Sequence, residues 1–93
     1  MTDSLLGHVL KSFYDSAPKG DKVASIHVFS IYYADMITDG NKQVNEIIKY
    51  SGLPESYHTE VSKGIKLSKY VLLTEDIVKK IQIIQEKEEK LSC

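Results

Sequence analysis

Residues 44–64 have the sequence VNEIIKYSGLPESYHTEVSKG, which predicts a helix, a tight turn and a second helix. The first part has the apolar spacing of an amphipathic helix, at Val44, Ile47 and Ile48. Gly52 should end that helix, because glycine takes the left-handed conformation at little steric cost. We expect the next residue, Leu53, to enter the core and fix the angle between the two helices. This layout is that of a helix-turn-helix.

The buried positions of such a motif can be counted from Gly52. The position nine residues later should be apolar and holds Val61. The position six residues later should also be apolar, but it holds His58, with Tyr57 one place early. The position four residues before the glycine usually holds a small residue and here holds Ile48. The pattern therefore fits the motif with two departures.

Two helices are expected before the motif. The first covers residues 4–14, whose apolar side chains recur on one face, with Asp3 or Ser4 as its N-cap. An APKG break at residues 17–20 follows it. The second covers residues 22–38 and is apolar almost all round, so it should run through the centre without a wide solvent-facing stripe.

Helix ends are also predicted by the residues between these segments. Asp39-Gly40 should end the second helix, and Asn41 should cap the first helix of the motif. Thr74 is a suitable N-cap for a last helix that runs to about Leu91. The sequence therefore predicts a single all-α domain over residues 1–93 with about five helices, its core spanning about 4–73.

The segment at residues 65–73 has two interpretations. It could continue the second helix of the motif and then become an extended link, or it could form a short β segment like the wing of a winged helix. Its apolar spacing fits neither the helical nor the strand period cleanly. We favour a helix followed by an extended link.

The charge of the chain limits its partners. The net charge is −1 and there is no arginine, so the bidentate arginine contact to guanine is unavailable. Residues 41–70 carry five lysines and three acids, whereas the remainder carries seven lysines and ten acids. Residues 41–70 are therefore the basic part of an otherwise acidic chain, and basic clusters are what bind phosphates.

Other classes of protein are disfavoured by simple features. The chain has no signal peptide and no apolar run near twenty residues, which predicts a soluble, cytoplasmic protein. Its single cysteine, Cys93, excludes an internal disulfide and a cysteine-rich zinc site. No nucleophile–base pair, glycine-rich phosphate loop or carboxylate pair has a recognisable spacing, so we expect neither an enzyme nor a cofactor.

Several phrases of the chain resemble a known family. They are an APKG turn, the segment IHVFSIYYA at residues 26–34, SGL at residues 51–53, and SYHTEVSKGIKLSKYV at residues 56–71. Together they resemble the small bacterial "HTH-like domain" family over about residues 13–71. The resemblance implies a helix-turn-helix with a DNA-binding role and carries no catalytic residues.

The second helix of the motif supplies the candidate DNA-binding surface. With Val61 at the centre of its buried face, the opposite arc holds Thr59, Ser62, Lys63, Lys66 and Lys69. The lysines would supply charge to phosphates, and the hydroxyls would supply hydrogen bonds. Ser56 and His58, beside the turn, complete the candidate set. Glu55 also points into this arc and would repel phosphate, and a plain solvated helix face would show the same lysines.

His27 lies among apolar residues of the second helix of the chain. We interpret it as a hydrogen-bonded core histidine and not as a catalytic one. The three histidines are too scattered in the sequence to predict a metal site.

The last helix predicts a homodimer. Its apolar side is expected to hold Ile77, Ile81 and Ile84, whereas Ile83 points away from that side, towards what would be solvent in a monomer. Dimeric helix-turn-helix proteins bind paired half-sites on DNA. We therefore expect dimer contacts, at least partly, through residues 74–91.

Two functions are consistent with the sequence. The first is a helix-turn-helix protein that binds double-stranded DNA in the major groove, as a small regulator of transcription or a targeting subunit. The alternative is a helical protein-interaction module, such as an adaptor or small inhibitor, that keeps the fold without binding DNA. The absence of arginine favours the alternative, and the lysine arc favours DNA.

Overall fold

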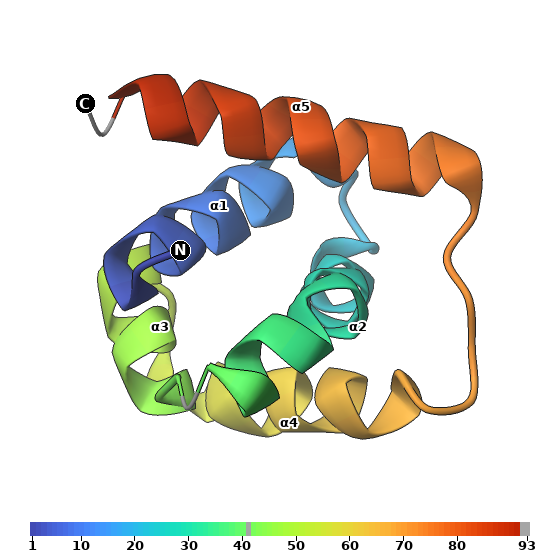
Figure 1. Ribbon diagram of the computed structural model, residues 1–93, viewed down its shortest axis with the longest axis horizontal. Coiled ribbons are helices and arrows are strands. Elements are labelled where there is room, and N and C mark those ends of the chain that lie inside the picture. The colour runs from blue at the N-terminus through green and yellow to red at the C-terminus, as the bar shows by residue number, and fades with distance from the viewer. Residues whose placement is uncertain (41, 92–93) are drawn as a thin grey trace.

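The computed structural model describes residues 1–40 and 42–91. These residues form five α-helices and one short 3-10 helix, arranged around a central core (Figure 1). The elements are α1 Asp3–Ser16, α2 Lys22–Asp39, α3 Val44–Ser51, η1 Glu55–Tyr57, α4 His58–Leu67 and α5 Glu75–Leu91. The predicted all-α domain is confirmed, and no strand occurs among the described residues.

The helices pack in pairs around one core. Helix α1 packs against α3 and α2 packs against α4, while α5 crosses the outside of α1 (Figure 1). Every helix contributes to the interior, where the largest fully buried side chains are Leu6, Leu10, Ile26, Phe29, Tyr33, Ile47, Ile48, Val61 and Ile81. Burial of these side chains is the main source of stability in a chain of this size.

Two glycines let the paired helices approach closely. A β-carbon at Gly7 of α1 would lie 2.7 Å from the carbonyl oxygen of Ile47 in α3. A β-carbon at Gly64 of α4 would lie 2.8 Å from the carbonyl oxygen of His27 in α2. Neither distance leaves room for a methyl group beside main-chain atoms. Each helix pair is therefore in contact at a point that only glycine can occupy without displacing its neighbour.

Helix α2 is central, and its exposed residues lie near its two ends. Its inner face is formed by Ile26, Phe29, Tyr33 and Ile37. Val23, Ala24, Asp35 and Met36, near its two ends, are exposed, whereas every residue from 25 to 34 is buried or half-buried. The expected absence of a wide solvent-facing stripe is therefore confirmed, and the exposure of Val23 and Met36 is confined to the ends of the helix.

The N-cap of α1 also differs from the prediction. Thr2, and neither Asp3 nor Ser4, caps this helix, with its side-chain oxygen accepting a hydrogen bond from the Leu5 main-chain N–H at 3.0 Å. The cap predicted at Asn41 and the cysteine at position 93 lie outside the described residues. Thr74 does cap α5, with its hydroxyl oxygen 3.4 Å from the main-chain nitrogen of Ile77.

The alternatives for residues 65–73 are resolved in favour of a helix and a link. Helix α4 ends at Leu67, a turn follows, and residues 71–74 run without regular structure to the start of α5 (Figure 1). The wing interpretation is therefore wrong. No helix in the described part of the chain is long and apolar enough to cross a membrane.

Candidate nucleic-acid interface

The turn of the motif is built around Gly52. Its φ of 75° is left-handed, and its N–H donates to the carbonyl oxygen of Lys49 at 3.2 Å. Ser51 fixes the main chain after Gly52, because its hydroxyl oxygen accepts a hydrogen bond from the N–H of Leu53 at 3.1 Å. Leu53 is buried, as predicted. The predicted helix–turn–helix geometry of α3 and α4 is thus confirmed, with η1 inserted between the turn and α4.

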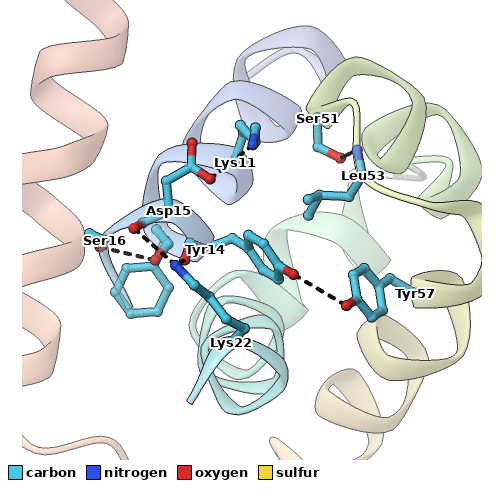
Figure 2. A network of polar contacts seen from close by, with 9 residues as sticks. Lys11, Tyr14, Asp15, Ser16, Lys22, Ser51, Leu53 and Tyr57 are labelled. Atoms are coloured by element: carbon cyan, nitrogen blue, oxygen red, sulfur yellow. Dashed lines mark hydrogen bonds and ion pairs between the residues drawn. The ribbon is translucent and has the colours of Figure 1, made fainter. Parts of the chain in front are cut away.

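Tyr57 accounts for one departure from the motif pattern. Its ring packs at the edge of the core, and its hydroxyl lies 3.2 Å from the hydroxyl of Tyr14 in α1 (Figure 2). The two ring centroids are 5.8 Å apart. Because η1 places Tyr57 over the core, His58 is exposed at the start of α4. The apolar position has therefore moved one residue earlier in the chain.

Figure 2 also shows how the end of α1 is tied to the start of α2. The Lys22 ammonium donates to the carbonyl oxygens of Tyr14 at 2.9 Å and Asp15 at 3.1 Å. It also lies 5.3 Å from the centre of the Tyr14 ring, which is within the range of a cation–π contact. These contacts position Tyr14, and through it they support the 3-10 turn that leads into α4.

The buried face of α4 agrees with the expected helical wheel. Val61 and Gly64 are buried against α2, and Ile65 is half-buried beside them. Ser68, just after the helix, turns its hydroxyl back to the carbonyl oxygen of Ile65 at 2.6 Å. The orientation of α4 is therefore determined by its packing on α2.

The opposite face of α4 carries the predicted lysines. Lys63, Lys66 and Lys69 are all exposed, Thr59 is exposed, and Ser62 is half-buried. Ser56 and His58 lie exposed at the end of the surface nearest the turn. All seven predicted residues are thus at least partly exposed, over η1, α4 and the turn that follows it. We call the set Ser56, His58, Thr59, Ser62, Lys63, Lys66 and Lys69 the α4 surface.

An acid within α4, Glu60, borders this surface and pairs both with α2 and with one lysine of the surface. The Glu60 carboxylate lies 2.8 Å from Nε2 of His27 in α2 and 3.5 Å from the ammonium of Lys63. The hydrogen bond to His27, aided by the Lys63 charge, lowers the pKa of Glu60. The carboxylate therefore stays ionised and paired. His27 is half-buried and hydrogen-bonded, in agreement with the expected structural role.

This contact was not predicted from the sequence. Glu60 and His27 are 33 residues apart, so no spacing within one helix connects them. The same is true of Tyr14 and Tyr57, which are separated by 43 residues. The sequence indicates only that Glu60 is next to Val61, and therefore near the boundary between the buried and exposed faces of α4. It does not indicate His27 as its partner.

A groove with acidic side chains borders the α4 surface near the turn. It is lined by Asn45, Glu46, Lys49, Ile48, Leu53, Glu55 and His58. Glu55 is exposed, in agreement with the sequence prediction that it lies close to the candidate surface. The positive charge is therefore concentrated toward the C-terminal end of α4.

The isoleucines of α5 do not share one surface. Ile81 is buried in the chain's own core, and Ile77 and Ile84 pack against that core. Ile83 alone among them is exposed, in a shallow depression beside Ser16. Ile84 is half-buried and lines the same depression as Ile83, whereas Ile81 is not accessible to a second chain.

Similarity to known proteins agrees with this geometry. A family model described as an HTH-like domain matches residues 2–74, which include α1 to α4 and the link. The chain belongs to the HTH-like domain family. Comparison with curated proteins and with solved structures gave no match. The HTH-like domain match ends immediately before α5, so the last helix lies outside it.

Proposed function

We propose that this HTH-like domain protein binds double-stranded DNA through the α4 surface, with α4 in the major groove. The observation that carries the proposal is the exposed pair Lys63 and Lys66 on a helix packed against α2 through Val61 and Gly64, with Lys69 exposed in the turn that follows. Lysines spaced by three residues along a helix can reach successive phosphates, and Thr59 and Ser62 are hydrogen-bonding groups for base edges. Such a protein would act in the cytoplasm as a small regulator or targeting subunit, without catalysis or cofactor.

The pairing of Glu60 supports this proposal. On a helix that approaches DNA, an unpaired carboxylate would repel the phosphates. Here the carboxylate is 20 % exposed and is bonded to His27, so its charge is partly screened from a ligand at the α4 surface. Glu55 remains as an exposed acid near the turn, which favours phosphate contacts toward the Lys66–Lys69 end of the helix.

The alternative function is a protein-interaction module that keeps the fold without binding DNA. Two observations favour it: the chain has no arginine, and its net charge is −1. The residual acidity lies mostly outside residues 41–70, so a protein partner with a basic surface would be attracted to the rest of the domain. Measurement of DNA binding separates the two functions directly.

The experiment is a salt titration of binding to a pool of duplex DNA. In the variant with Lys63, Lys66 and Lys69 all changed to alanine, the slope of log K against log salt should fall by about three, because each phosphate contact releases about one counterion. The control changes the exposed lysines of α5, Lys79, Lys87 and Lys90, to alanine. This control removes the same charge and should leave the slope nearly unchanged.

Selection of preferred sequences from a random duplex pool tests the base contacts. Substitution of Thr59 or Ser62 by alanine should alter the selected sequence, whereas the lysine variants should weaken binding to all sequences alike. If the wild-type protein shows no binding to duplex DNA at low salt, the proposal fails and the protein-interaction module becomes the better account.

A further inference from the structure

The link between α4 and α5 has an unusual surface for a monomeric protein. Leu72 is 98 % exposed and Tyr70 is 80 % exposed, with Leu67 and Val71 partly exposed beside them. Large apolar side chains with this degree of exposure are uncommon when they are contiguous in the chain, and contiguous apolar patches mark interaction sites. The patch lies outside the α4 surface and outside the depression beside Ile83.

Exposure alternates along the link as it does in an extended chain. In residues 71–73, Leu72 is almost fully exposed, whereas Val71 before it is less exposed and Leu73 after it packs against the core. Successive side chains of an extended segment point in opposite directions, which produces this alternation. A shallow hollow lies beside the link, lined by Ile31 and Tyr32 of α2 and by Val78 of α5.

The main chain is open in the middle of the link, at residues 71–73. Within the described residues, Val71, Leu72 and Leu73 make no hydrogen bond through their main-chain N–H or carbonyl groups. An open segment with a free main chain and exposed apolar side chains can accept another strand, because main-chain hydrogen bonds supply affinity and the side chains supply specificity.

The sequence of the link is complementary to itself in antiparallel order. When Leu72 is placed opposite Leu72 of a second copy, Val71 lies opposite Leu73, and Lys69 lies opposite Glu75. Two-fold symmetry makes each of these flanking pairs occur twice. Both Lys69 and Glu75 are exposed, and neither is ion-paired within the described part of the chain. An antiparallel pair therefore buries the leucines between two pairs of opposite charges.

We propose that two copies of this protein dimerise through the link, with residues 71–73 paired in antiparallel order about Leu72 and with Lys69, in the turn before them, beside Glu75 at the start of α5 of the other copy. The proposal does not depend on DNA binding, although Lys69 belongs both to this interface and to the α4 surface. It names a different surface from the depression on α5, where Ile83 and Ile84 lie beside Lys79, Lys80 and Asp76. In the link, by contrast, apolar side chains and free main-chain groups occur together.

The first test measures the mass of the protein by sedimentation, from micromolar to submillimolar concentration and with reductant present. The wild type should approach twice 10.5 kDa. Leu72→Asp should raise the dimer dissociation constant on the order of 100-fold, because it places two carboxylates at the centre of the interface. At a concentration low enough for the wild type to be monomeric, the thermal unfolding of Leu72→Asp should match that of wild type, since Leu72 makes little contact within its own chain. Ile83→Lys is the matched control and should leave the dimer intact.

The second test exchanges the flanking charges. Lys69→Glu and Glu75→Lys should each weaken the dimer roughly tenfold, since each change turns two attractive pairs into repulsive ones. The double variant restores the opposite charges and should recover wild-type association. An equimolar mixture of the two single variants should form heterodimers in preference to homodimers.

The outcomes separate the alternatives. A wild-type protein that remains at 10.5 kDa over the whole concentration range overturns the proposal. A dimer that survives Leu72→Asp but is lost on Ile83→Lys also overturns it and assigns the contact to α5. A dimer lost on Leu72→Asp but insensitive to both charge changes contradicts the antiparallel register.

Discussion

The helices of this protein meet in two different ways. Within the segment that matches the family, α1 meets α3 at Gly7 and α2 meets α4 at Gly64, and at both points a main-chain atom fills the space beside the glycine. Helix α5 instead rests on α1 through side chains. Ile81 is buried, and the Ser12 hydroxyl donates to the carboxylate of Glu88 at 2.9 Å.

The difference separates contacts that fix geometry from contacts that add stability. A helix pair in contact at a glycine has one allowed spacing, because even a methyl group would force the helices apart. A helix held by side chains can change its residues as long as the apolar area is kept. We therefore expect substitutions at the glycine crossings to disturb the whole domain, and substitutions in α5 to act mainly on α5.

The largest effect is expected for Gly64→Ala. The added carbon would meet the Ser30 side chain and the carbonyl oxygen of His27, and main-chain atoms cannot move aside cheaply. We expect the free energy of unfolding to fall by about 3 kcal/mol, at the upper end for overpacked cores. Urea unfolding measures this loss, and Lys66→Ala on the exposed side of α4 is the control. A loss below about 0.5 kcal/mol, the range of neutral surface changes, would mean that α2 and α4 separate easily.

A smaller effect is expected for Ile81→Ala in α5. Truncation of a buried isoleucine reduces the free energy of unfolding by about 2 kcal/mol or more. Here the loss is limited to the free energy with which α5 packs on the rest of the domain, because α5 can detach while the other helices stay folded. Hydrogen exchange should show faster exchange of α5 amides, with those of α2 and α4 unchanged. Ile83→Ala removes the same atoms from an exposed position and should leave stability within about 0.5 kcal/mol of wild type. Uniformly faster exchange in all helices would show that α5 unfolds together with the rest of the domain and not as a separate unit.

The smallest effect is expected for Gly52→Ala at the turn. No atom lies within 4 Å of the added carbon, so the penalty is only that of a left-handed conformation, about 1 kcal/mol. The comparison with Gly64→Ala thus separates a glycine required by main-chain conformation from one required by space. Equal losses of stability in thermal or urea unfolding would contradict this distinction.

The fold was predictable to the extent that it depends on local patterns. The turn at Gly52, the burial of Leu53 and Val61, and the start of α5 at Thr74 follow from residue preferences that act within a few positions. The wing interpretation at residues 65–73 failed for a local reason as well, since a short apolar run has no clear period. The exposure of Val23 and Met36 depends on where neighbouring helices end, which the apolar pattern of α2 does not contain.

The candidate site was predictable only in part for a related reason. The exposed lysines of α4 follow from the helical wheel once Val61 is placed in the core. The pairing of Glu60 with His27 depends on how α2 crosses α4, and that crossing depends on Gly64. The sequence alone does not distinguish Gly64 from the other residues on the buried side of α4. The close approach that it permits is a tertiary property with no signature in the sequence around it.

The crossing at Gly64 also affects how α4 can meet a partner. Because α4 cannot rotate about its axis or slide along α2 without a main-chain clash, its exposed side chains keep a constant spacing whether or not anything is bound. Little main-chain conformational freedom then remains to be lost on complex formation, and only the lysine side chains need to become ordered. Association with the α4 surface should accordingly proceed as the docking of a preformed shape, at a rate governed by diffusion and charge, without a slow folding step.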